Sequence, residues 1–372
     1  MSFRSLRDFM AALEKDGDLK RISAPVSSDL EITEIAWRGI KEGGPALLFE
    51  NVQGSKFPLA INLFGTDRRV ERALGRHPEE IGAAFTRLAH ALQPPNPAAA
   101  WAERGTLLKM MAMRPAALKA GPSQEVVEEP NLDSMPILKC WPKDGGPFIT
   151  FPLVITRSPS TGKRNLGTYR IHKFDTRTTG VHWQIMKGGG YHYAEAEARN
   201  EPLPMAIALG GDPALLFSAI CPLPEGVDEV AFAGFLRGDP VPMQRGISTP
   251  LETPSEAEFV LEGFVPPEER RIEGPFGDHF GHYSHASPFP VFHVTKVTRR
   301  KDAIYHAIVV GQPPMEDKFL GDAIQVLFKP ILKILHPELV DLWTYYETGF
   351  HNLLVLSVDS RYAKEAVKTA LP

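Results

Sequence analysis

The residues from Glu273 to Ser284, EGPFGDHFGHYS, place two carboxylates and two histidines among glycines and a proline. Because proline lacks a backbone donor and glycine favours turns, this segment is not expected to be helical. A turn at 275–277 could bring Glu273 and Asp278 together. Paired carboxylates beside an arginine can separate two pKa values and keep one proton for donation at neutral pH. The alternative is a tight surface loop whose charges are solvated.

The histidines of this segment allow a different chemistry. Asp278, His279, His282 and His285 could bind a metal ion, but they lack the i, i+4 histidine pair on a helix that zinc proteases use. A zinc site made only of protein ligands is therefore the weaker interpretation. Three further histidines are interpreted as core or surface residues: His172, His293 and His306.

Two other segments carry groups suited to ions and phosphates. In NLGTYR, Asn165 offers a neutral oxygen to a hard cation, and Arg170 can fork onto a carboxylate. In HWQIMKGGGYHY, residues 182–193, Lys187 and three glycines offer a cation and exposed N–H groups to a phosphate. Taken singly, the first could be an ordinary edge strand and the second a hairpin turn, and the second matches neither a Walker A loop nor a dinucleotide fingerprint.

The bulk composition limits the class of protein. A chain of 372 residues with 43% hydrophobic and 23% charged residues is typical of a soluble globular protein with two or three domains. The net charge of -4, without a basic face or tail, argues against a nucleic-acid partner. No apolar run approaches the ~18 residues of a membrane span, and the acidic N-terminus argues against a signal peptide. The isolated Cys140 and Cys221 fit a reducing cytosol.

The periodicity of apolar residues predicts the elements that must position these groups. Residues 1–129 alternate helical and strand patterns, which predicts a small α/β domain. Residues 130–312 read as a mainly β domain with helical insertions, such as a barrel. In this domain we expect Asp212 to cap a helix, residues 274–280 to form a strand, and a helix at 224–238.

The remaining residues, 313–372, predict a long helix at 317–340 that Pro330 should kink, then a strand at 348–359 and a helix at 360–372. A strand and a helix with no returning strand leave a free sheet edge. We therefore expect the natural chain to continue past Pro372.

Four segments follow one another along the chain: NLGTYR, HWQIMKGGG, CPLPEGVDEVAFAGFLRG and EGPFGDHFGHY. Taken together and in this order, they resemble segments of the UbiD-type carboxy-lyases, which are decarboxylases that use prenylated FMN. The resemblance covers essentially the whole chain. It implies an α+β or α/β multidomain fold with an N-terminal α/β domain, a central split β-barrel related to flavin reductases, and a long linker helix that starts a C-terminal α/β domain.

The resemblance also implies roles for individual residues. Asn165 and Glu229 match the metal ligands, which bind Mn²⁺ or Mg²⁺ and link it to the cofactor phosphate, and K⁺ is a further candidate ion. Arg170, Glu273 and Asp278 match the catalytic network, with Asp278 as the proton donor and Glu273 expected to raise the pKa of Asp278. The residues that match the flavin-binding positions are Thr168, Tyr169, Arg170, His182, Trp183, Gln184, Lys187 and Gly188.

One position departs from the family pattern. Family members commonly carry a histidine metal ligand just before the basic residue and glycines, and here that position is Met186. A thioether is a soft ligand and a poor partner for Mn²⁺ or Mg²⁺. His182 lies about 13 Å away along a strand, at ~3.3 Å per residue, and is too far to replace it. The expected metal site therefore has two protein ligands plus waters, or binds its ion more weakly.

The activity implied is reversible, non-oxidative decarboxylation of an aromatic or α,β-unsaturated acid through a covalent adduct with prenylated FMN. A 4-hydroxybenzoate-type acid, including a polyprenylated one, is the first choice of substrate. The alternatives are a flavin-dependent reductase, a catalytically silent flavin-binding homologue, and a metal-dependent hydrolase built on the histidines. The resemblance further implies a cofactor-supplying FMN prenyltransferase, a homodimer or larger homo-oligomer, and a cytoplasmic location, with peripheral membrane association if the substrate is polyprenylated.

Overall fold

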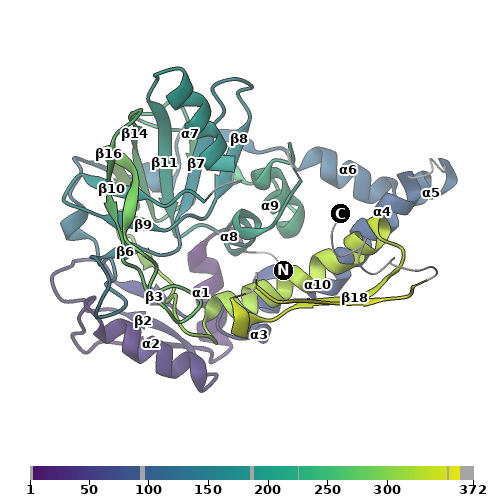
Figure 1. Cartoon of the computed structure of the whole chain (residues 1–372), viewed down its shortest axis with the longest axis horizontal. Helices are drawn as coiled ribbons and strands as arrows, with labels where there is room; N and C mark the ends of the chain where they lie inside the picture. Colours follow the sequence, from purple (N-terminus) through teal and green to yellow (C-terminus); the bar gives the residue numbers. More distant parts are fainter. Residues whose placement is uncertain (1–2, 93–96, 185–187, 225, 350–351, 361–372) are drawn as a thin grey trace.

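The computed structural model describes residues 3–92, 97–184, 188–224, 226–349 and 352–360. In Figure 1 the N-terminal elements lie beside a large β-sheet, and the helices α4 and α10 extend away from both. The chain is therefore a mixed α/β protein, as the sequence predicts. None of the helices in the described ranges is both long and apolar enough to span a membrane.

The N-terminal part of the chain contains a four-stranded sheet in the order β1-β2-β3-β17. Its last strand comes from Tyr305 and His306 and pairs in parallel with β3, so the chain returns from the large sheet to complete the small one. Helix α1 buries its apolar face, and its Ser5 cap accepts a hydrogen bond from the Asp8 amide, as expected for an amphipathic helix. The elements are α1 (Leu6–Lys15), β1 (Leu19–Ile22), α2 (Glu31–Lys41), β2 (Ala46–Phe49), β3 (Leu59–Ile61), α3 (Asp67–Leu74), α4 (Pro78–Leu92) and β17 (Tyr305–His306).

The central part of the chain forms a ten-stranded sheet in the order β6-β9-β10-β16-β14-β11-β7-β8, with β15 and β5 both paired to β16. Among the described residues no ladder joins the end strands β6 and β8, so the expected split barrel stays a prediction. The strands are β5 (Val126–Glu128), β6 (Phe148–Ile149), β7 (Leu153–Arg157), β8 (Arg164–Gly167), β9 (Ile171–Lys173), β10 (Thr178–Val181), β11 (Leu203–Leu209), β14 (Phe259–Val265), β15 (Arg270–Glu273) and β16 (Ser287–Arg299).

The chain between α4 and β14 also contains further helices and short strands. Asp212 caps α8 as predicted, because its side chain accepts a hydrogen bond from the Leu215 amide at 3.0 Å. The elements are α5 (Pro97–Ala102), α6 (Arg104–Ala112), α7 (Gly188–Ala198), α8 (Pro213–Ile220), α9 (Glu229–Arg237), a sheet of β13 (Glu252–Pro254), β12 (Pro242–Arg245) and β4 (Ala116–Leu118), and the 3₁₀ helices η1 (Pro122–Gln124) and η2 (Leu132–Ser134).

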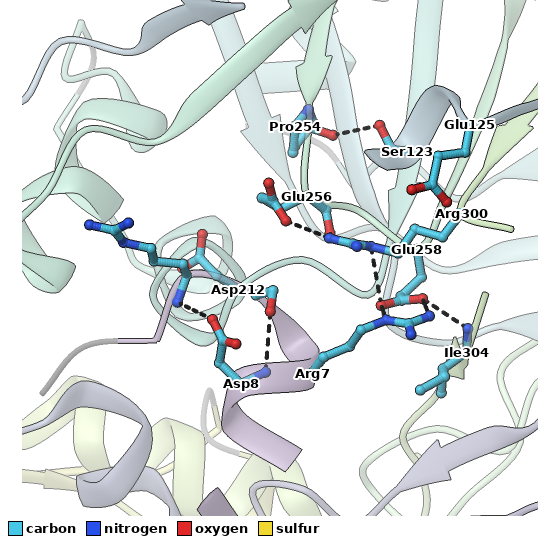
Figure 2. A network of polar contacts seen from close by, with 12 residues as sticks. Arg7, Asp8, Ser123, Glu125, Asp212, Pro254, Glu256, Glu258, Arg300 and Ile304 are labelled. Atoms are coloured by element: carbon cyan, nitrogen blue, oxygen red, sulfur yellow. Dashed lines mark hydrogen bonds and ion pairs between the residues drawn. The ribbon is translucent and has the colours of Figure 1, made fainter. Parts of the chain in front are cut away.

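A buried carboxylate fastens the N-terminal helix to the central sheet (Figure 2). Glu258 is fully buried and accepts two hydrogen bonds of 2.8 Å from Arg7 and one of 2.9 Å from the Ile304 amide. Arg300 approaches the same carboxylate at 3.5 Å. Because a buried charge is stable only when it is paired, these contacts fix α1 against the loop that follows β16.

Helix α10 (Glu316–Leu335) is anchored at its first residue. The buried Glu316 carboxylate accepts hydrogen bonds from the Asn62 and Phe64 amides, each at 2.9 Å. The helix then packs against α4 so closely that a Cβ on Gly82 would lie 2.3 Å from the Leu327 carbonyl oxygen. A hairpin of β18 (Leu339–Thr344) and β19 (Leu354–Val358), with η3 (Tyr346–Thr348) between them, follows the helix.

Several predicted elements differ from the structure. Residues 274–280 form a loop after β15, not a strand, and Gly188–Ala198 form a helix, not a hairpin turn. Helix α10 ends at Leu335, and the residues after it form β18, which the sequence analysis missed together with α5 and α6. The predicted strand near 348–359 is confirmed as β19. The predicted helix at 360–372 lies almost wholly outside the described residues, and the expected domain boundaries after residues 129 and 312 stay predictions.

His306 generates a prediction about stability. Its ring is fully buried beside Phe64 and Phe151, and neither nitrogen has a hydrogen-bond partner among the described residues. Burial lowers the pKa of His306 to about 3. The unfolded chain therefore binds a proton that the folded chain excludes, and this group costs stability as the pH falls from about 6.5 towards 3, by at most about 1.4 kcal/mol per pH unit.

We expect His306→Phe to lose stability less steeply than the wild type between pH 6.5 and 5, because phenylalanine cannot take up that proton. Urea unfolding at several pH values measures the difference. Parallel pH profiles for the two proteins would contradict the assignment.

Candidate active site

Arg170 lies at the centre of a network of charged side chains, between β8 and β9. Its Nε and Nη2 atoms donate to the two carboxylate oxygens of Glu273 at 2.7 and 3.0 Å, and its Nη1 donates to Asp278 at 3.0 Å. The Glu273 side chain is fully buried, Arg170 is 10% exposed and Asp278 is 24% exposed. The structure therefore brings together the three residues that the sequence predicts as catalytic.

The backbone of the loop after β15 explains why the two acids reach one arginine. Gly274 has a φ of 87° and Gly281 a φ of 77°, values that favour glycine. Between these turns, Asp278 exchanges backbone hydrogen bonds with the other side of the loop, from its amide to the His282 carbonyl at 3.0 Å and from the Gly281 amide to its carbonyl at 2.9 Å. Glu273 and Asp278 therefore meet at one arginine as predicted, but these hydrogen bonds place the turn at residues 278–282 and not at 275–277. We call residues 274–284 the acid loop.

Two neighbours of Arg170 were missed in the sequence analysis. Ser284, at the end of the acid loop, lies with its hydroxyl oxygen 3.0 Å from Arg170 Nη2. Phe276 is buried with its ring 4.9 Å from the guanidinium carbon, in a cation–π arrangement. Neither residue type carries a sequence signal for such a contact, although both belong to the motif that includes the acids. Together they leave the guanidinium little freedom to rotate.

The protonation states correct one expectation. Burial tends to raise the pKa of Asp278, but the hydrogen bonds and charge of His279 and the charge of Arg170 outweigh it, so the net pKa is below its ordinary value and not raised. Burial would also raise the pKa of Glu273. The hydrogen bonds and charges of His182 and Arg170 outweigh burial, so the net pKa of Glu273 is lowered.

His279 carries the proton that Asp278 lacks. Its Nδ1 lies 2.6 Å from the Asp278 carboxylate. Burial of the His279 ring opposes its charge, yet the hydrogen bond and charge of Asp278 raise its pKa overall. A proton bound by this pair therefore favours the His279 ring over the Asp278 carboxylate, and the titration belongs to the pair.

His182 faces the same network. Its Nδ1 lies 3.1 Å from Glu273, and its ring packs against Phe289 with the centroids 4.2 Å apart. His182 thus contacts the acid that holds Arg170, and its predicted role in cofactor binding stays a prediction. His282 and His285 are exposed. Within the described ranges, no three or more histidine, cysteine or acidic side chains are arranged to hold a metal ion.

A second group of residues lies around Asn165 in β8. The Asn165 amide donates to the Tyr169 hydroxyl at 3.2 Å, and the Gly189 amide donates to the same hydroxyl at 3.1 Å. A Cβ on Gly188 would lie 2.0 Å from Asn165 Oδ1. The absence of a side chain at Gly188 is therefore what leaves room for the Asn165 oxygen.

Glu229 reaches this group from the start of α9. Its carboxylate accepts a hydrogen bond from the Leu166 amide at 3.2 Å. Burial raises the pKa of Glu229 to about 7. The charge of Glu229 also contributes, after burial, to the raised pKa of Tyr169. Asn165 and Glu229 are thus neighbours, and each offers an oxygen atom of the kind that hard divalent cations bind.

Two buried polar atoms near Asn165 lack partners. Thr168 Oγ1 and Trp183 Nε1 have no hydrogen-bond partner among the described residues. Gly189 packs against the Trp183 ring, and a Cβ there would lie 2.7 Å from Nε1. Unsatisfied buried polar groups call for an explanation, and a polar ligand that approaches this surface would satisfy them. Gln184 is exposed beside it. Lys187 and Met186 lie outside the described residues.

Comparison with protein-family models identifies all three parts of the chain. The models are those of the 3-octaprenyl-4-hydroxybenzoate carboxy-lyase (UbiD) family. The N-terminal domain matches residues 10–89, the Rift-related domain residues 116–313, and the C-terminal domain residues 318–371. Together these matches cover most of the chain.

Similar proteins include enzymes that act on aromatic acids. A component of the 4-hydroxybenzoate decarboxylase of Chlamydia pneumoniae is 42% identical over 374 aligned residues, which cover 100% of this chain and 63% of that protein. The closed form of vanillic acid decarboxylase from Sedimentibacter hydroxybenzoicus has a TM-score of 0.85 at 27% identity, covering 100% of this chain and 77% of that one. An evolved dimeric form of HmfF from Pelotomaculum thermopropionicum, in complex with prenylated FMN, has a TM-score of 0.81 at 26% identity, covering 99% and 82%.

The burial of Glu273 generates a prediction. We expect Glu273→Ala to lower the free energy of unfolding by about 3 kcal/mol, because it leaves the buried Arg170 with an incomplete set of partners. Urea denaturation measures the loss. Glu269→Ala is the matched control, since Glu269 pairs with His293 at a half-exposed position and should cost less than about 1 kcal/mol. Equal losses in the two variants would contradict the central role of Glu273.

Proposed function

This chain belongs to the UbiD family of carboxy-lyases, and on that premise we propose that it removes CO₂ from an aromatic carboxylic acid with the help of prenylated FMN. A 4-hydroxybenzoate-type acid is the substrate class we favour, because the similar proteins are named for 4-hydroxybenzoate and vanillic acid. The reverse carboxylation follows the same path. An FMN prenyltransferase would supply the cofactor.

The arrangement of Arg170 carries this proposal. A buried arginine held by one fully buried acid and one partly exposed acid provides a fixed cation and a nearby proton source. A reductase does not need an arginine held by two acids, because hydride transfer between a nicotinamide and a flavin does not require a cation that binds a carboxylate. The geometry therefore favours decarboxylation over the reductase alternative.

The residues around Asn165 fit the cofactor. Prenylated FMN, when bound, supplies the electron sink that no side chain offers for the charge left by the departing CO₂. Thr168 and Trp183 carry buried polar atoms, without partners among the described residues, that a flavin would satisfy. Gly188 and Gly189 allow Asn165 and Trp183 to lie against the start of α7. Asn165 and Glu229 would bind Mn²⁺ or Mg²⁺ next to the cofactor phosphate, and the burial of Glu229 makes a neighbouring cation favourable.

The side chains of the network then have separate tasks. Arg170 would orient the substrate carboxylate through its positive charge and its Nη1 atom, since Glu273 and Ser284 already accept from Nε and Nη2. Glu273 keeps Arg170 in place. After CO₂ has left, Asp278 would pass the proton that it shares with His279 to the ring carbon, so that one C–C bond is replaced by one C–H bond.

The direct test uses the protein co-expressed with an FMN prenyltransferase and supplied with 4-hydroxybenzoate and related acids. We expect the wild type to release CO₂ and to exchange the corresponding ring hydrogen of the product with deuterium from the solvent. Asp278→Asn should lower both rates by roughly 100-fold or more, because it removes the proton donor. The first rate is measured from the CO₂ released, and the exchange of the ring hydrogen is measured by NMR.

His285→Asn is the control, because His285 is an exposed histidine close to the same loop. It should retain wild-type rates, whereas a large loss would instead support a role for the histidines. Retained turnover and ring exchange in Asp278→Asn would refute its assignment as proton donor. A wild type that oxidises a nicotinamide through its flavin but releases no CO₂ would support the reductase alternative.

A further inference from the structure

The segment CWPKDGG, residues 140–146, packs directly against the acid loop, although the two are far apart in the sequence. Asp144 is the main contact. One of its carboxylate oxygens accepts a hydrogen bond from the Gly277 amide at 2.7 Å, and the other accepts one from the Trp141 amide at 2.8 Å. Asp144 is buried, with 6% of its surface exposed. The buried carboxylate thus ties the backbone just before Asp278 to a separate part of the fold.

Trp141 fills the space beside this hydrogen bond. Its indole lies between two glycines, because a Cβ on Gly277 would lie 2.1 Å from the ring and one on Gly311 would lie 2.4 Å from it. The indole N–H donates to the Val310 carbonyl at 2.7 Å, which sets the ring orientation. A rigid aromatic ring thus presses directly on the backbone at Gly277, and only a glycine fits there.

Residues 143–145 of the same segment contact both sides of the acid loop. The Gly145 amide donates to the Pro275 carbonyl at 2.8 Å, and a Cβ on Gly145 would lie 2.1 Å from the Gly274 carbonyl oxygen. On the other side, the Lys143 amide donates to the Tyr283 hydroxyl at 3.2 Å. The segment therefore holds the loop near its start and near its end, with Asp278 between the two.

From these contacts we infer that Asp144 is a positioning residue for proton transfer, which acts through the Gly277 amide to set where the Asp278 carboxylate lies. The inference rests on the proposed function, because it assigns Asp144 to the protonation step of that reaction. Asp144 itself makes none of the contacts with Arg170 described above, so its effect passes through the backbone. A displacement of about 1 Å at a reacting group can reduce a rate by roughly 100-fold.

The position of the hydrogen bond between Asp144 and the Gly277 amide makes the expected effect specific to Asp278. Asp278 is adjacent to Gly277, and its own amide is already bound to the other side of the loop at His282. Releasing the Gly277 amide would allow the backbone of residues 275–278 to shift while β15 and Glu273 stay in the sheet. The expected defect is therefore a misplaced Asp278 with an intact pair of Arg170 and Glu273.

The test compares Asp144→Ala with Glu262→Ala. Glu262 is the matched control because it is also a buried carboxylate that accepts backbone hydrogen bonds, from the Ile247 and Ser248 amides of a different loop. Both variants should lose thermal stability. Only Asp144→Ala should show faster backbone deuterium exchange in residues 275–284, measured by mass spectrometry on the full chain, with unchanged affinity for FMN.

In the flavin-loaded enzyme, Asp144→Ala should lower kcat by roughly tenfold to 100-fold with KM changed less than about threefold, and its solvent deuterium isotope effect should rise because proton transfer becomes slower. Asp144→Asn should lie between Ala and the wild type, since its one amide oxygen can still accept from Gly277.

Three results would overturn the inference: unchanged deuterium exchange in the acid loop of Asp144→Ala, a kcat equal to that of Glu262→Ala, or an unchanged isotope effect. If the wild type releases no CO₂ from any acid, the proposed function fails. In that case the deuterium exchange still shows whether Asp144 holds the loop.

Discussion

The buried guanidinium of Arg170 is the constraint on which the site depends. A charged group away from water is stable only with partners of opposite charge in hydrogen-bonding geometry, and here Glu273 supplies a forked pair while Asp278 supplies a third bond. The three residues come from two distant parts of the chain. The sheet must therefore bring the start of β9 and the end of β15 together before any chemistry is possible, and the acid loop must then turn back onto them.

The rest of the central domain can be understood as support for that arrangement. Glycines permit the two tight turns of the acid loop and the close approach of the segment around Asp144. Glycines also bring the start of α7 against Asn165 and Trp183, where side chains would collide. The same domain thus holds a rigid charged network around Arg170 and, around Asn165, a second group of oxygen atoms and of buried polar atoms without partners among the described residues.

Much of this was predictable from local sequence. The meeting of Glu273 and Asp278 follows from the proline and glycine between them, and the Asp212 cap follows from its place before a helical pattern. Other features depend on tertiary contacts that no local pattern carries. Three glycines from Gly188 onwards favour a turn by propensity, yet they begin a helix that packs against aromatic rings. The pKa of Asp278 was expected to rise, but the orientation of the His279 ring reverses its direction.

The most direct measurement is a crystal structure of the full chain co-expressed with an FMN prenyltransferase and crystallised with Mn²⁺. We expect a flavin whose phosphate and metal ion lie next to Asn165 and Glu229 and whose ring faces Arg170, with the arginine still paired to Glu273. A flavin bound elsewhere, or an Arg170 turned away from the flavin ring, would contradict the proposed decarboxylase site.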